Sequence, residues 1–166
     1  MNNRIFDTLV HLLSSKNLRF HSDDHTLEIL SSVTSPSGAF LLRFKCLDLD
    51  NIILYAEILT PCPSSQIPLM VEFLNRINFG LPVGGFELNI LNGLIRYRVD
   101  ADFYNIDDIE GLLITLLTRN VKTVERYLPS IVKLCEGTSL KKVMESVSPI
   151  ELETIPSPQR RTCSLM

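Results

Sequence analysis

The dipeptide Asn92-Gly93 stands between two runs in which apolar and polar residues alternate. This is the strongest local constraint in the chain, because Asn-Gly is favoured in the type I′ turn that joins two antiparallel strands. Placing the two residues at the turn fixes the register: Ile90 faces Ile95, Leu88 faces Tyr97, Phe86 faces Val99, Asn89 faces Arg96 and Glu87 faces Arg98. The first three pairs are apolar and the last joins opposite charges, so the sequence predicts a β-hairpin with one apolar side.

The first eighty residues change from a helical to a strand periodicity and back. Apolar residues at helical spacing predict a first helix that begins after the possible caps Asn2 and Asn3 and ends near residues 16–17. From 27 to about 60, β-branched and aromatic runs broken by turn formers predict three antiparallel strands. A second helix follows, with Ser65 as its cap, Pro68 in its first turn and Gly80 at its left-handed end.

A long amphipathic helix is predicted to begin at an acidic capping box made by Asp107 and Glu110. Pro129 removes one hydrogen bond of this helix, so we expect a kink or a break near 127–128. A short helix should occupy 139–146. The predicted fold is therefore α+β, in the order α-β-β-β-α-β-β-α, with the helices on one face of an antiparallel sheet over residues 1–147.

Composition limits the classes of function. A chain of 166 residues with 45% hydrophobic and 21% charged residues fits one globular domain. The net charge of -3 predicts no basic stripe, and so disfavours nucleic-acid binding. The apolar runs are shorter than the ~20 residues that span a bilayer, and the first residues do not resemble a signal peptide. We therefore expect a soluble, cytoplasmic protein.

Several groups of residues could carry chemistry, but each has a simpler structural interpretation. His21 and His25 flank Asp23 and Asp24, yet they fall in a predicted turn rather than at the helical spacing that aims two histidines at one metal. The glycines at 80, 84 and 85 match no phosphate-loop pattern. Ser and Cys nucleophiles lack a local signature. The sequence thus predicts no catalytic residue, no cofactor and no metal.

Two further pairs of polar residues are candidate sites. Asp100 and Asp102 share a strand face with Arg96 and Arg98, which favours a solvated charged surface over an acid/base pair. Asn75 and Asn78 either line a ligand site between helix and sheet or bond to the backbone of the following loop.

The cysteines indicate reduced thiols and one candidate modification. Cys46, Cys62, Cys135 and Cys163 show no C-x-x-C pair and no spacing of a disulfide framework. Cys163-Ser164-Leu165-Met166 fits the C-a-a-X prenylation pattern, although composition alone can produce such an ending. Three prolines and few large apolar residues predict a disordered tail over 148–166.

Three stretches resemble the YbjN-like family, whose fold is similar to that of type III secretion chaperones. They are Phe73-Leu74-Asn75-Arg76-Ile77-Asn78, Gly85-Phe86-Glu87-Leu88 with Asn92-Gly93-Leu94-Ile95-Arg96-Tyr97-Arg98, and Tyr127-Leu128-Pro129-Ser130-Ile131 with Gly137. The resemblance spans roughly residues 3–147 and implies a bacterial adaptor, chaperone-like or regulatory protein. It implies no catalytic residue.

Side chains alternate along the second and third predicted strands, so one row faces the core and the other faces outward. The outward row is more apolar than a fully solvent-exposed sheet face normally is. We therefore expect Leu41, Ile53, Tyr55 and Leu59 to form a homodimer or client interface, with Tyr55 as its anchor. The sequence thus favours a non-enzymatic protein-binding adaptor. One alternative is an effector secreted into a host cell and tethered to membranes by prenylation at Cys163. Another is a hydrolase or ligand-binding domain with a dispersed site.

Overall fold

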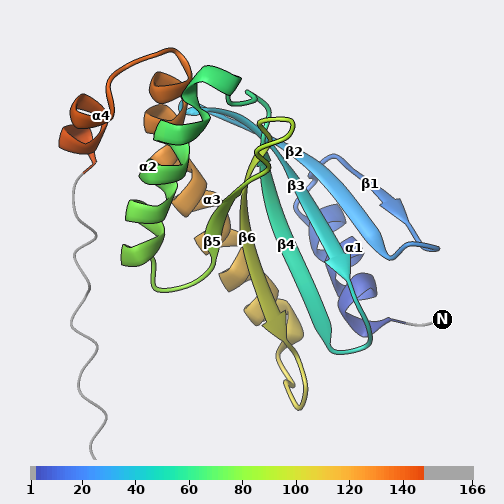
Figure 1. Cartoon of the computed structure of the whole chain (residues 1–166). Coiled ribbons are helices and arrows are strands. Elements are labelled where there is room, and N and C mark those ends of the chain that lie inside the picture. The colour runs from blue at the N-terminus through green and yellow to red at the C-terminus, as the bar shows by residue number, and fades with distance from the viewer. Residues whose placement is uncertain (1–2, 148–166) are drawn as a thin grey trace, which may run out of the picture.

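A six-stranded antiparallel sheet forms the centre of the fold (Figure 1). The computed structural model of the protein describes residues 3–147. The strands are β1 (Phe20–Asp23), β2 (Glu28–Ser35), β3 (Gly38–Cys46), β4 (Asn51–Ile58), β5 (Gly85–Leu88) and β6 (Ile95–Asp102). The helices are α1 (Arg4–Ser15), α2 (Ile67–Gly80), α3 (Ile109–Cys135) and α4 (Leu140–Ser146), and a short 3-10 helix, η1 (Ser64–Gln66), precedes α2.

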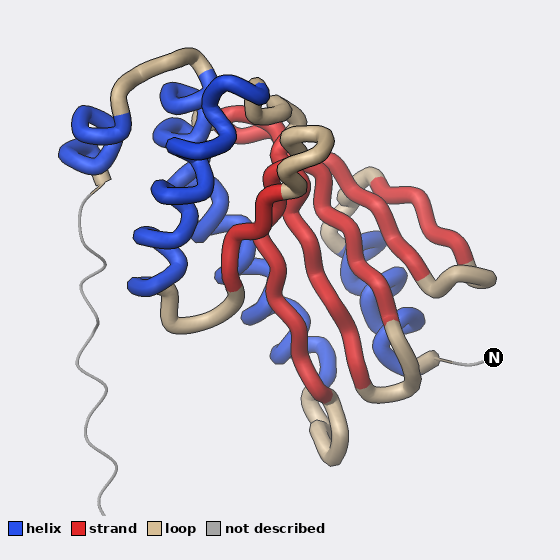
Figure 2. Tube along the Cα trace, viewed as in Figure 1, coloured by secondary structure: helices blue, strands red, loops and turns tan. Residues whose placement is uncertain are grey.

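The strands lie in the spatial order β1-β2-β3-β4-β6-β5, so only the last hairpin departs from chain order (Figure 2). Helices α1 and α3 lie on the same side of the sheet, behind it in Figure 1, and α2 lies beside the edge strand β5. The predicted α+β architecture with helices on one face is confirmed. No helix in residues 3–147 is long and apolar enough to cross a membrane.

The core lies between the sheet and the helices α1 and α3. Alternate strand residues point into it, as the sequence predicts for Phe40, Leu42, Phe44 and Cys46 on β3 and for Leu54, Ala56 and Ile58 on β4, all of which are buried. Helix α1 begins where expected, because the side chain of Asn3 accepts hydrogen bonds from the amides of Ile5 and Phe6.

Several details of the expected elements are wrong. Helix α2 has Gln66, not Ser65, as its N-cap, and its last residue, Gly80, does not have a left-handed φ. A strand was missed: β1 covers only four residues, three of them polar, so it gives no alternating pattern. Pro129 does not divide the helix, because α3 continues through it; the alternative expectation, a kink near 127–128, stays a prediction. Its N-cap is Asp108, which accepts from the amide of Gly111, rather than Asp107.

The hairpin exists, but its register differs by two residues from the predicted one. Glu87 pairs with Arg96 rather than with Arg98, and Phe86 pairs with Tyr97. Asn89 and Leu94 close a longer loop in which the Asn89 carbonyl accepts from the Gly93 amide at 2.8 Å. A type I′ turn needs positive φ at both central residues, whereas only Gly93 of the pair has it, at 72°. Because side chains alternate with period two, the shift leaves each residue on its predicted face.

Candidate binding face

The side of the sheet that points away from α1 and α3 carries no described helix, and we call it the open face (Figure 1). Strand pairing places the following residues on it: Leu30, Leu41, Arg43, Lys45, Ile53, Tyr55, Glu57, Glu87, Arg96, Arg98 and Asp100, with Glu28 beside Lys45. The face is therefore a mixture of apolar side chains and both signs of charge.

Ion pairs between neighbouring strands cover much of the β2, β3 and β4 part of the open face. Arg43 Nε donates to Glu57 Oε1 at 2.8 Å, and its Nη1 lies 3.2 Å from Glu28 Oε2. Lys45 Nζ lies 3.0 Å from the other oxygen of Glu28. The hydrogen bond from Lys45 lowers the pKa of Glu28, while Glu57 raises the pKa of Arg43. These contacts place both cations against carboxylates on the open face.

The β5 and β6 part of the face has a second group of charges. Arg96 Nε donates to Glu87 Oε2 at 2.6 Å. Arg98 lies 3.7 Å from the same carboxylate and 3.5 Å from Asp100. The expected neighbours Glu87 and Arg98 thus interact diagonally, since Arg96 occupies the position directly opposite Glu87.

Tyr55 lies between these two groups of charges. Its cross-strand neighbours are Arg43 and Arg98, and the guanidinium carbon of Arg96 is 4.1 Å from the centroid of its ring. This distance is within the range of a cation–π interaction. The centre of the open face is therefore one tyrosine surrounded by three arginines, the residue types that most often dominate binding energy at protein interfaces.

The four residues predicted to bind a partner are not equally available. Leu41, Ile53 and Tyr55 lie on the open face as predicted. Leu41 and Tyr55 are half-buried, but Ile53 is only 8% exposed and offers little area to a partner. Leu59 is 61% exposed, although β4 ends at Ile58 and Leu59 lies just beyond it. Their binding role stays a prediction.

Sequence reasoning did not select Arg43, Arg96 and Arg98 as binding residues. The alternation of each strand already places them on this face, and that signal could have identified them.

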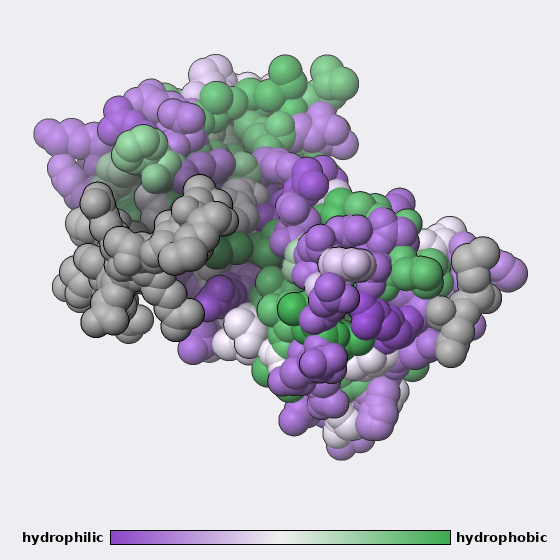
Figure 3. Space-filling model, turned by 90° about the horizontal axis from the view of Figure 1, so that it is seen from below, coloured by the Kyte–Doolittle hydropathy of each residue, from purple (hydrophilic) through white to green (hydrophobic). Residues whose placement is uncertain are grey.

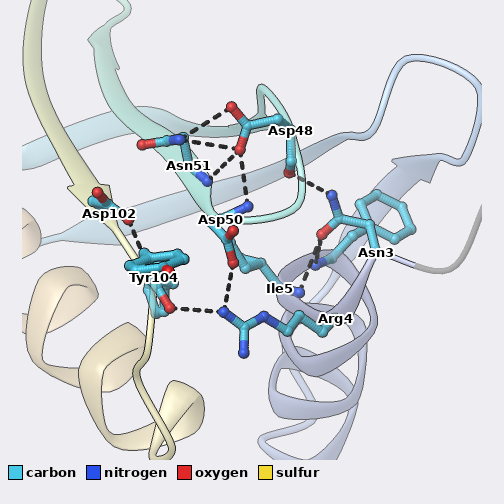
Figure 4. A network of polar contacts seen from close by, with 10 residues as sticks. Asn3, Arg4, Ile5, Asp48, Asp50, Asn51, Asp102 and Tyr104 are labelled. Carbon is cyan, nitrogen blue, oxygen red and sulfur yellow. Dashed lines mark hydrogen bonds and ion pairs between the residues drawn. The ribbon is translucent and has the colours of Figure 1, made fainter.

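A separate polar network fastens α1 to the loops at one end of the sheet (Figure 4). Arg4 donates to Asp50 at 2.5 Å and to the carbonyl of Phe103 at 2.7 Å. The Asn3 amide donates to the carbonyl of Asp48 at 2.7 Å. Viewed from this end, hydrophilic and hydrophobic side chains intermingle on the surface (Figure 3). We interpret the network as structural, because each contact ties the helix to a loop.

The candidate metal ligands are not brought together. His21 lies in β1, not in the predicted turn, while His25 lies in the turn between β1 and β2. The carboxylate of Asp23 accepts from the amides of His25 and Thr26, and the bond from His25 lowers its pKa. This is an Asx-type turn. Among residues 3–147, no group of His, Cys, Asp and Glu is arranged to hold a metal.

Asn78 has the structural role that was one of its two interpretations. Its side-chain amide donates to the carbonyl of Phe86 at 2.9 Å and accepts from the Phe86 amide at 2.8 Å. These bonds occupy the backbone groups of Phe86 on the edge strand β5, which another β-strand could otherwise pair with. Asn75 is exposed on α2. The two asparagines therefore do not form a shared buried site.

The described cysteines are buried and free. Burial raises the pKa of Cys46 and of Cys135 to about 12, and it also raises the pKa of Cys62. Thiolate, not thiol, is the nucleophile, so these three side chains are poorly suited to chemistry near neutral pH. Cys163 and the predicted tail over 148–166 lie outside the described residues.

No protein-family profile and no curated protein sequence matches this chain. Among solved structures, E. coli YbjN, described as a candidate transcription regulator, superposes with a TM-score of 0.56 at 11% identity, covering 75% of this chain and 88% of YbjN. The Yersinia pestis type III secretion chaperone SycH, solved with a fragment of YscM2, gives a TM-score of 0.46 at 10% identity, covering 71% and 98%. The chain therefore has the YbjN-like fold that its sequence resembles.

Proposed function

We propose that this protein is a non-enzymatic adaptor that binds another polypeptide through the open face of its sheet. One observation carries the proposal: the helices α1 and α3 cover one side of the sheet, and the uncovered side presents Tyr55 among Arg43, Arg96 and Arg98. A two-layer domain buries the second face of its sheet only if something else packs there. The likeness to YbjN, described as a candidate regulator, supports a regulatory adaptor by analogy of fold.

The charge pattern of the open face favours a second copy of this chain as the first partner to test. Apart from Asp100 on β6, the sign alternates from strand to strand: Glu28 on β2, Arg43 on β3, Glu57 on β4, Arg96 on β6 and Glu87 on β5. Two copies of such a face, offset by one strand, place opposite charges against each other. A two-fold interface uses the same patch on both subunits, so this pattern suits a homodimer.

Site-specific crosslinking tests the proposal directly. Tyr55 is replaced by the photo-reactive residue p-benzoylphenylalanine, and Val71, an exposed apolar residue of α2, is replaced in the same way as the control. Illumination in cells should crosslink position 55, but not position 71, to a second copy or to another polypeptide. Absence of any crosslinked polypeptide from position 55 contradicts the proposal.

A double substitution tests the same face energetically. Replacing Leu41 and Tyr55 with Asp should abolish association measured by light scattering, because it puts new charges in the centre of the face. The opposite rows hold the core, so circular dichroism should remain unchanged. Leu69→Asp with Val71→Asp, on the exposed side of α2, is the matched control and should leave association intact.

The tetrapeptide Cys163-Ser164-Leu165-Met166 supports a second candidate function, a host-directed effector tethered to membranes by a lipid. A fluorescent fusion in eukaryotic cells should then move to membranes, and Cys163→Ser should return it to the cytosol. The same diffuse distribution for both forms, with no added mass on the wild-type protein, would reject this candidate.

A further inference from the structure

The outer side of α3 carries a row of cations that is separate from the cations of the open face. Arg119, Lys122, Arg126 and Lys133 are all exposed. At ~100° per residue they fall within an arc of roughly 60° around the helix. The buried residues of α3, among them Val124 and Ile131, lie on the other side. We call these four residues the α3 basic stripe.

Most of the α3 basic stripe is not neutralised by neighbouring carboxylates. Eight ion pairs join side chains of the described residues, and none of them involves Arg119, Lys122 or Lys133. The guanidinium of Arg126 lies 5.8 Å from the centroid of the Tyr127 ring. By contrast, all four cations of the open face have acidic partners. The stripe therefore keeps a net positive charge that faces solvent.

The composition of the stripe indicates what could bind there. The other exposed residues on this side of the helix are Thr115, Thr118 and Pro129, so no large apolar side chain is exposed there. Protein interfaces generally have an apolar core, whereas contacts to nucleic-acid phosphates need only charged and polar donors. From Arg119 to Lys133 the stripe is roughly 21 Å long at 1.5 Å per residue, enough to follow several phosphates.

We propose that the α3 basic stripe binds the phosphate backbone of a nucleic acid, without reading its sequence. The net charge of -3 predicted no such stripe, and that expectation is wrong for the folded chain. Acidic residues gather instead at the end of the sheet where β3 turns into β4 and β6 ends (Figure 4), and just before α3 begins, among them Asp48, Asp50, Asp102, Asp107 and Asp108. The folded chain therefore has a basic region and an acidic region, although its net charge is only -3.

The test is fluorescence anisotropy of a labelled 30-base-pair DNA duplex titrated with the full chain. Arg119→Glu with Lys122→Glu removes two stripe cations. Lys16→Glu with Arg19→Glu is the matched control, because it changes one lysine and one arginine at the same spacing, both exposed and outside the ion pairs. Losing two phosphate contacts should weaken binding ~10-fold or more. The control should change affinity by less than about 2-fold, and circular dichroism should show both variants folded.

Salt dependence supplies the second measurement. With three to four phosphate contacts, the logarithm of the association constant should fall with the logarithm of salt concentration with a slope of about -3. The proposal is overturned by no binding at 50 mM salt, by equal loss in both variants, or by tighter binding of poly-glutamate or anionic lipid vesicles than of DNA.

Discussion

At the scale of single residues, Asn120 differs from every other buried polar side chain in the described chain. It lies on α3, is 0% exposed, and neither its amide nitrogen nor its amide oxygen has a hydrogen-bond partner. A buried polar group without partners costs ~1–3 kcal/mol. Asn120→Leu keeps a similar size and removes both unpaired atoms, so it should raise the free energy of unfolding by roughly that amount. Urea denaturation followed by circular dichroism measures it, and a loss of stability would show that the amide is paired in solution.

Asn78 provides the opposite case with the same residue type. Its amide makes two hydrogen bonds to the backbone of Phe86 on β5. Asn78→Leu deletes both and leaves a backbone donor and acceptor of an edge strand unpaired, so it should lower the free energy of unfolding by ~1–3 kcal/mol. Urea denaturation with the Asn75→Leu variant, changed at an exposed position, gives the comparison. Equal effects at 75 and 78 would mean that these bonds contribute little.

At the scale of elements, sequence periodicity predicted the helices and strands that have their own repeating pattern, and missed features that depend on contacts with other elements. The apolar face of α1 and the alternation of β3 and β4 are confirmed, and each repeats its pattern over eight or more residues. Strand β1 has only four residues and pairs with β2 after a turn, so its identity depends on its partner. Helix α3 passes through Pro129 because its packing against the sheet and α1 offsets the local cost of a proline.

The loop between β5 and β6 depends on its glycine for two reasons. Gly93 has a φ of +72°, and a Cβ there would lie 2.2 Å from the carbonyl oxygen of Cys62. Gly93→Ala should therefore lower the free energy of unfolding by more than ~1 kcal/mol. Gly80, the last residue of α2, has no atom within 4 Å of such a Cβ, so Gly80→Ala should be neutral or slightly stabilising. Thermal denaturation compares the two, and an equal response would contradict this account.

At the scale of the whole molecule, sequence alternation was enough to place residues on the open face but not to pair them. The contact between Tyr55 and Arg96 exists because β6, not β5, lies beside β4. That order is a property of the topology, and no pattern inside either strand encodes it. In the same way, the α3 basic stripe exists because one side of α3 packs on the core and the other faces solvent, and the net charge of the chain contains no information on that orientation.

Three carboxylates with lowered pKa values should make the folded protein less stable as the pH falls. Lys45 lowers the pKa of Glu28 below its ordinary value of 4.5, and backbone amides lower the pKa of Asp48 and Asp23 below 3.8. A depressed folded-state pKa gives stability that is present above the unfolded value and is lost as pH falls through the folded one. The free energy of unfolding should therefore decrease as the pH is lowered from about 5 towards 3.

Glu28→Gln isolates the contribution of the open face to this pH dependence. The variant should show a shallower decrease in the free energy of unfolding below pH 5, because its amide at 28 does not titrate and cannot form the ion pairs with Lys45 and Arg43. Glu145→Gln, at an exposed position of α4 outside the eight ion pairs, should leave the slope of the wild-type protein unchanged. Added salt should narrow the difference between wild type and Glu28→Gln, since it screens partly exposed charges. Parallel curves for wild type and Glu28→Gln at low salt would show that the ion pairs around Arg43 do not hold the open face together in solution.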